Sequence, residues 1–220
     1  MVRFGVRSKI ACLAALVIAA LPAIGCRGLA FTTAYLLQGT DVDPDFKDLK
    51  GKKVAVVCRP SETYSNSNVS RDLARQVSIL LHDKVPKIKM VEHQEVADWM
   101  DKNTWEEYPE VGKAVKADMV VAIELEQFSD LAGQTLYQGK ANATIMVYDC
   151  KKGGKEVFQR HLPQVVYPRS APVQAAERGT EEQFRREFVM VLADRIGRYF
   201  YAHDPNADIG EDAVALGARQ

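Results

Sequence analysis

The chain has 220 residues, of which 47% are hydrophobic and 26% are charged, so it can form one packed domain but is short for two. Basic and acidic residues number 29 each, yet the only charged residues before Cys26 are Arg3, Arg7 and Lys9. Residues 26–220 therefore carry 26 basic and 29 acidic side chains, a net charge of −3. This balance argues against nucleic-acid binding, which depends on neutralising phosphates.

The first 26 residues have the three parts of an export signal. Basic residues extend to Lys9, an apolar run follows from Ile10, and small residues precede Cys26. A helix that spans a bilayer needs roughly 20 uninterrupted apolar residues, and this run is shorter and contains Pro22. We therefore expect a signal rather than a permanent membrane span.

The sequence Ala23-Ile24-Gly25-Cys26 resembles the lipobox of bacterial lipoproteins, which usually has Leu where this chain has Ala23. The resemblance implies that residues 1–25 are removed and that the Cys26 sulfur is linked to diacylglycerol. Two or three acyl chains hold a protein firmly in a membrane. Arg27 stands where lipoproteins retained in the inner membrane have Asp, which favours the outer membrane. An uncleaved signal anchor and an ordinary secretory signal remain as alternatives.

The sequence after the signal divides into a tether, a domain and a tail. Residues 26–48 are predicted to be a lipidated tether, because Gly, Thr, Asp and Pro are frequent in residues 39–45. Residues 49–203 are predicted to form the domain. Residues 204–220 are acidic and rich in helix breakers, so we expect a disordered tail.

The first half of the domain alternates between strand and helix patterns. The apolar run KKVAVVC, residues 52–58, is typical of a strand buried on both faces. Apolar residues at helical spacing from Val69 to Val85 predict a long helix. A second strand is expected over residues 87–92, short helices over 94–102 and 109–116, and a third strand over 119–128.

The second half predicts a hairpin and a closing helix. Polar and apolar side chains alternate over residues 134–150, as in a strand with one wet face, and the turn KKGG leads into a strand over 155–162. Thr180 and Gln183 form the capping box of a final helix. The element order predicts an α/β fold, a mixed sheet of about five strands with three parallel strands, then an antiparallel hairpin, and flanking helices.

The two cysteines of the domain are expected to be unbonded. Cys58 ends a parallel strand and Cys150 ends an antiparallel one, which places them at opposite ends of the sheet. A disulfide joins α-carbons at most about 7 Å apart. Both thiols are predicted to pack as small side chains.

Three stretches of the domain carry a family resemblance: residues 52–57 (KKVAVV), residues 114–121 (AVKADMVV), and Val147-Tyr148-Asp149 with residues 153–157 (GGKEV). They resemble envelope α/β domains, namely the TolB amino-terminal domain, CsgG and lipoproteins that activate peptidoglycan synthases. The resemblance covers about residues 49–201 and implies a fold more than a function. Lys116 and Glu124 stand where that family usually has Gly. Asp118 is predicted to cap the turn into the third strand.

Neither catalysis nor metal binding is predicted. The chain has no G-x-S-x-G elbow, no S-x-x-K pair, no Walker loop and no G-x-G-x-x-G turn. Its four histidines are scattered, without a second ligand at the spacing that zinc prefers. The connection over residues 129–134 is too short for two membrane strands of about 9 to 11 residues each, which argues against a CsgG-like pore. We expect no enzyme activity and no cofactor.

A ligand or partner site is expected at the carboxyl ends of the parallel strands, where α/β sheets open a crevice. The candidates are Arg59, Ser61, Glu62, Tyr64, Asn66 and Asn68 after the first strand, and Ser129 and Asp130 after the third. A polar loop in which Asn68 or Ser70 caps the long helix is the alternative. A second candidate surface is the wet face of the hairpin, with Gln138, Lys140, Asn142 and Thr144, which is otherwise an ordinary solvated face.

Two functions remain open from the sequence. The first is a membrane-anchored interaction or assembly module that faces the periplasm, with an unidentified envelope protein as partner. The alternative is a lipid-anchored small-ligand binder or enzyme that uses the loop after the first strand. That alternative requires a concave pocket with convergent polar groups.

Overall fold

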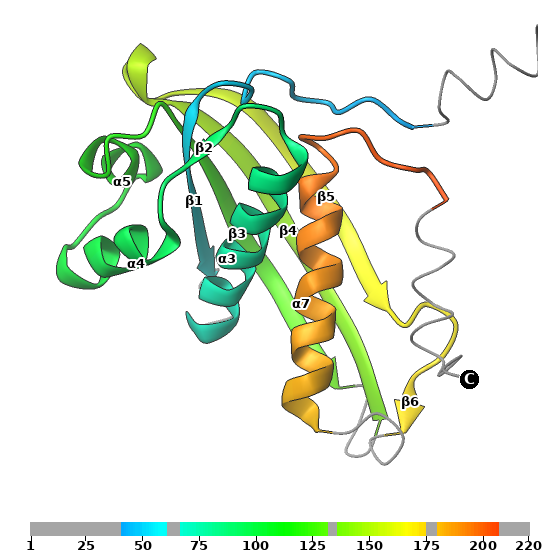
Figure 1. The fold of residues 1–220 in the computed structure, drawn as a ribbon. Coiled ribbons are helices and arrows are strands. Elements are labelled where there is room, and N and C mark those ends of the chain that lie inside the picture. The colour runs from blue at the N-terminus through cyan, green and yellow to red at the C-terminus, as the bar shows by residue number, and fades with distance from the viewer. Residues whose placement is uncertain (1–40, 61–66, 132–135, 175–179, 207–220) are drawn as a thin grey trace, which may run out of the picture. The chain divides into compact units, whose positions relative to one another are not determined.

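The computed structural model describes residues 41–60, 67–131, 136–174 and 180–206 (Figure 1). The strands are β1 (Lys53–Pro60), β2 (Lys89–Met90), β3 (Met119–Leu131), β4 (Leu136–Asp149), β5 (Lys155–Tyr167) and β6 (Val173–Gln174). The helices are α3 (Ser67–Lys84), α4 (His93–Lys102), α5 (Tyr108–Ala114), the 3-10 turn η1 (Cys150–Lys152) and α7 (Glu181–Gly197). No helix in this described part of the chain combines the length and the hydropathy needed to span a bilayer.

The strands form one mixed sheet in the order β2-β1-β3-β4-β5, and the short β6 pairs with β4. β2, β1 and β3 are parallel, whereas β3, β4 and β5 are antiparallel. The α/β fold with three parallel strands followed by a marginal hairpin is therefore confirmed. Helical crossovers follow β1 and β2, as parallel neighbours require.

Two strands differ from the predicted bounds. β2 has two residues instead of the expected six, because its partner residues on β1 are only Lys53 and Val54. β5 continues past Pro163 to Tyr167. This is possible because β5 is the last strand of the path, and a shift in its register with β4 falls between Leu162 and Val165, around the proline.

The main core lies between the sheet and the pair α3 and α7, which lie side by side over one face in Figure 1. Leu73, Val77 and Leu81 repeat along one side of α3 and are fully buried. From α7, the buried side chains include Phe184, Phe188, Leu192 and Ile196. The capping box at Thr180 and Gln183 is present, so the predicted start of this helix is confirmed.

The other face of the sheet is covered over only part of its width. α4 and α5 pack Val96, Val111 and Val115 against alternate residues of β1 and β3, which makes a second, smaller core. No other helix in the described residues packs on this face. The face of β4 and β5 that lies beyond α5 therefore remains open, with Lys140 exposed and Asn142 and Thr144 half-buried.

Part of the predicted tether packs on the domain. Val42 and His203 form an antiparallel bridge, and the Phe46 amide donates to the Tyr199 carbonyl over 2.9 Å. The Phe46 ring is buried against Phe158, with centroids 5.2 Å apart. Packing therefore extends back to Val42, before the expected start of the domain at residue 49.

The cysteines behave as predicted. Cys58 and Cys150 are both free. Cys58 pairs with Ile123 on β3, whereas Cys150 follows Asp149, which pairs with Met119 at the start of β3. The intervening length of β3 separates the two thiols along the sheet.

Candidate functional site

A cavity of about 200 Å³ lies at the outer edge of β1, between α3 and α4. It is lined by Val56, Val57, Cys58, Arg59, Pro60, Ser70, Arg71, Ala74, His93, Val96, Ala97, Met100, Asp101 and Trp105. The cavity is at the carboxyl end of β1, which is where the strand order predicted a crevice. For scale, an engineered apolar cavity of about 150 Å³ holds a benzene molecule.

The short second strand creates this cavity. β2 pairs with β1 only at Lys53 and Val54, so β1 has no neighbouring strand on that side from Val56 onward within the described chain. The Val54 carbonyl already accepts from the Val91 amide on this side. Backbone groups of alternate residues share one edge of a strand, so Val56 and Cys58 present theirs to the cavity.

Arg59 is a polar group of the cavity whose position is fixed by its neighbours. Its guanidinium carbon lies 4.0 Å from the ring centre of Trp105 and 5.0 Å from that of Tyr108, and its Nη2 donates to the Glu106 carbonyl over 2.9 Å. Stacking on two aromatic rings fixes the plane of the guanidinium and leaves its edge available to an anion. The predicted candidate Arg59 therefore lines the cavity.

Tyr108, whose ring lies against Arg59 but does not line the cavity, has an unsatisfied hydroxyl. The side chain is 8% exposed, and its hydroxyl has no hydrogen-bond partner among the described residues. Burial raises the pKa of Tyr108 well above its ordinary value, so the hydroxyl is protonated at neutral pH. A buried donor without a partner is uncommon in folded proteins and is often satisfied by water or a ligand.

Four other polar residues of the lining form an ion pair and a buried hydrogen bond. Arg71 of α3 bridges to Asp101 of α4 over 2.5 Å, and both side chains are about half exposed. Cys58 is hydrogen-bonded to Ser70, and burial raises the pKa of its thiol to about 12. A protonated thiol is a poor nucleophile, so Cys58 is a packing residue and not a reactive one.

Of the other predicted residues, those that the structure describes do not line this cavity. Ser61, Glu62, Tyr64 and Asn66 lie outside the described residues, and so does Cys26. Asn68 is exposed on the first turn of α3. Asn68 and Ser70 both lie inside the helix, so neither is its N-cap.

Ser129 and Asp130 lie in a different part of the fold from Arg59. β1 ends at Pro60, opposite Leu125, but β3 continues to Leu131 beside β4. Asp130 accepts a hydrogen bond from Arg185 of α7 over 2.6 Å, and Ser129 donates to the Leu131 carbonyl. These two residues therefore support the hairpin and α7, and they do not line the cavity.

The open face of the hairpin carries a polar network centred on Glu126. Asn142 donates to Oε2 of Glu126 over 2.8 Å, and Thr144 donates to Oε1 over 2.7 Å. His161 of β5 lies 3.4 Å from Oε1. With the exposed Lys140, these residues form what we term the polar sheet face. Gln138, at its end, donates to the Pro168 carbonyl.

Asp118 has a structural role, but its side chain contacts more distant elements than the turn into β3 that it was predicted to cap. Its Oδ2 accepts from the Lys53 amide over 2.9 Å, and its Oδ1 lies 2.7 Å from Lys151 Nζ. The Lys151 hydrogen bond, together with the Lys53 amide, lowers the pKa of Asp118. Asp118 therefore joins the start of β1 to η1.

The structure resembles solved structures of bacterial proteins, one of which is described as a lipoprotein. The PelC dodecamer from Paraburkholderia phytofirmans matches with 9% identity and a TM-score of 0.41, over 70% of this chain and 92% of that one. The lipoprotein GNA1162 from Neisseria meningitidis matches with 11% identity and a TM-score of 0.41, over 66% and 96%. The C-terminal domain of LpoB from Salmonella enterica matches with 13% identity and a TM-score of 0.35, over 59% and 89%.

No family model matches the sequence, and no curated protein matches it. Because these TM-scores lie below 0.5, we draw the function from this chain's own residues.

Proposed function

We propose that this chain is a lipid-anchored protein of the bacterial envelope that acts as a non-catalytic interaction module. The anchor is the diacylglycerol-modified Cys26, and the domain faces the periplasm, with the outer membrane favoured over the inner. The export signal and the sequence Ala23-Ile24-Gly25-Cys26 support the anchor. The interaction role is carried by one observation: the polar sheet face has no helix over it in the described chain.

The polar sheet face suits a protein partner because its side chains are already arranged. Glu126 holds Asn142 and Thr144 through two short hydrogen bonds, so these side chains lose little conformational freedom on binding. Lys140 remains exposed beside them. A partner with polar groups at matching positions can exchange water for direct hydrogen bonds, as protein interfaces commonly do.

Site-specific photo-cross-linking in intact cells tests this interaction. A photoreactive amino acid replaces Lys140 on the polar sheet face, and a matched variant carries it at Arg75, which is exposed on α3 over the opposite face. We expect one discrete adduct from position 140, weakened by Glu126→Lys, and no such adduct from position 75. Equal adducts from both positions, or none from position 140, would contradict the proposed surface.

The cavity at Arg59 favours a second function, the binding of a small organic acid. Val57, Val96 and Met100 supply apolar lining, while the Arg71 charge is paired with Asp101 and leaves Arg59 to meet an anion. The volume fits a single aromatic ring or a short branched chain. The class of ligand is therefore a monocarboxylate with a compact apolar body.

Phenylacetate is a suitable probe, because Trp105 lines the cavity and Trp fluorescence can report its binding. Arg59→Met should weaken phenylacetate binding at least tenfold. The neutral analogue 2-phenylethanol should bind the variant and the wild type alike. If Arg59→Met bound neither ligand, Arg59 would act by shaping the cavity. Equal phenylacetate binding by the variant and the wild type would contradict an anion-binding role for Arg59.

A further inference from the structure

Lysines are concentrated at one end of the sheet. The starts of β1, β2, β3 and β5 and the end of β4 share this end, as their pairing requires. Exposed lysines lie near the strand starts at this end and form what we term the basic rim: Lys50, Lys87, Lys89, Lys113, Lys116 and Lys155. In Figure 1 the rim corresponds to the end that holds η1 and the start of β1.

The positive charge of the rim exceeds the acidic residues near it. Asp118 is paired with Lys151 and Asp149 with Lys152, at 2.7 and 3.3 Å, so these carboxylates are balanced by lysines outside the rim set. Asp83 is followed by Lys84 at the end of α3, and the exposed Asp48, Glu110 and Glu156 also lie close in sequence to rim lysines, which outnumber them. The six rim lysines therefore leave a net positive surface.

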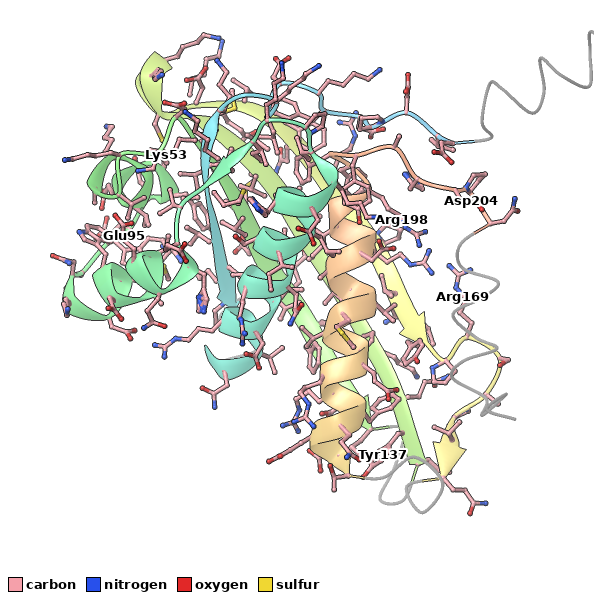
Figure 2. All side chains as sticks on the ribbon, viewed as in Figure 1. Lys53, Glu95, Tyr137, Arg169, Arg198 and Asp204 are labelled. Carbon is pink, nitrogen blue, oxygen red and sulfur yellow. The ribbon has the colours of Figure 1, made fainter. Side chains whose placement is uncertain are left out.

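The opposite end of the sheet carries an ion-pair cluster. There, the carboxylates of Asp130 and Glu181 both contact Arg185. Figure 2 shows Lys53 and Tyr137 at the two opposite ends of the sheet.

Two rim lysines occupy backbone conformations that favour glycine. Lys87 has φ = 61° and Lys116 has φ = 53°. Lys116 closes α5, where the Ala117 amide donates to the Gly112 carbonyl and the Lys116 amide to the Lys113 carbonyl. Glycine is the usual residue at this position of a helix end. A strained lysine at each of two turns suggests that the charge itself is used.

The chain also enters the domain at the end that carries the rim. Val42 pairs with His203, beyond the C-terminal end of α7, and the segment from there to Lys52 crosses this end to the start of β1 (Figure 1). Residues 27–41 separate Cys26 from this point, and they reach at most about 50 Å when fully extended. An anchor at Cys26 would hold the rim near the bilayer and raise its effective concentration at the lipid surface.

We infer that the basic rim rests on the anionic headgroups of the membrane that carries the anchor, so that the polar sheet face and the Arg59 cavity are held in a fixed orientation to the bilayer. Lysines within a Debye length of an anionic leaflet are attracted to it, and each contributes about a fivefold increase in partitioning. The orientation rests on the proposed anchor, whereas the affinity for anionic lipid belongs to the domain alone.

Vesicle sedimentation tests the affinity without the anchor. The chain from residue 26 with Cys26→Ser is mixed with vesicles of phosphatidylcholine alone or with added phosphatidylglycerol. We expect binding only to the anionic vesicles and loss of that binding at high salt. Equal binding to neutral vesicles, or none to anionic ones, would overturn the inference. Because this chain carries no lipid, a negative result here does not contradict the proposed anchor at Cys26. Evidence against the anchor would likewise not contradict the affinity of the domain for anionic lipid.

Paired variants separate charge from folding. Lys87→Gly with Lys116→Gly should lower binding to anionic vesicles about 25-fold while keeping or raising the melting temperature, because glycine suits both turns. The control variant carries Arg75→Gln and Lys140→Gln, which remove two exposed charges elsewhere. An equal loss of binding in the control would show that net charge, and not the rim, is responsible, and would overturn the inference.

Discussion

The ring of Phe188 lies directly over the α-carbon of Gly139. A β-carbon at position 139 would come within 2.4 Å of the Phe188 Cγ. The ring also lies against Phe128 and Tyr167, with centroids 5.1 and 6.4 Å away, so it has little freedom to move. This contact fixes α7 against the far half of the hairpin.

Gly139→Ala is therefore expected to destabilise the domain by about 1–3 kcal/mol, because overpacking displaces a well-packed ring. Chemical denaturation measures the change. In a double-mutant cycle, Phe188→Leu should recover part of the loss, since a smaller side chain leaves room for the new methyl group. Fully additive effects of the two substitutions would show that position 139 acts through something other than Phe188.

The Asp118 carboxylate should make stability depend on pH in the acid range. The Lys151 hydrogen bond and the Lys53 amide lower its pKa below the ordinary value of 3.8. A group with a lowered folded-state pKa contributes stability above its unfolded pKa, and the contribution is lost as pH falls through the folded value.

Asp118→Asn should thus lower stability by about 1 kcal/mol at pH 7, and the difference from wild type should shrink below about pH 4. Thermal denaturation across this range provides the measurement. Asp72→Asn, at an exposed position of α3, is the matched control and should leave the curve unchanged. A pH-independent difference for Asp118→Asn would show that its charge is not the cause.

The two domain thiols should differ in their reaction with iodoacetamide. Cys58 is buried, with a pKa of about 12, whereas Cys150 is half-buried, and burial also raises the pKa of its thiol. In the Cys26→Ser chain at neutral pH, we expect slow labelling of Cys150 and none of Cys58 until the protein unfolds. Peptide mass spectrometry reports both sites. Rapid labelling of Cys58 in the folded protein would contradict this prediction and would mean that the structure opens at the edge of β1.

Thr180 is predicted to stabilise the start of α7. Its hydroxyl accepts from the Gln183 amide over 3.2 Å, and its own amide donates to the Gln183 side chain over 3.0 Å. Thr180→Ala should cost about 1 kcal/mol, and Thr180→Ser much less, because serine keeps the accepting oxygen. Denaturation midpoints of the two variants check this order, and equal losses would contradict the capping role.

Sequence patterns predicted the elements whose burial is regular. The apolar run of β1, the alternation along β4 and the capping box of α7 each reflect one local rule, and the structure follows all three. The ends of β2 could not be predicted in this way, because its length depends on where the chain leaves the sheet to begin α4. The pairing at Lys53 and Val54 that decides this is not a local property.

Among the predicted site residues that the structure describes, Arg59 lines the cavity and Asn68, Ser129 and Asp130 do not. Arg59 was found because polar residues after a buried strand indicate a crevice. Asp130 was predicted to lie near Arg59. It does not, because β3 extends past the end of β1 and places the Asp130 side chain beside Arg185. Trp105 and Tyr108, which hold the Arg59 guanidinium, were missed because the path of the connection before α5 and of the start of α5 over β1 depends on tertiary packing.

The intact mass of the protein recovered from cell membranes decides most directly whether Cys26 holds this domain at a lipid surface. We predict a chain that begins at Cys26 and carries the added mass of a thioether-linked diacylglycerol, and a Cys26→Ser variant that lacks this mass and leaves the membrane fraction. A mature protein with an unmodified Cys26 thiol, or a chain that retains residues 1–25, would contradict the lipid anchor.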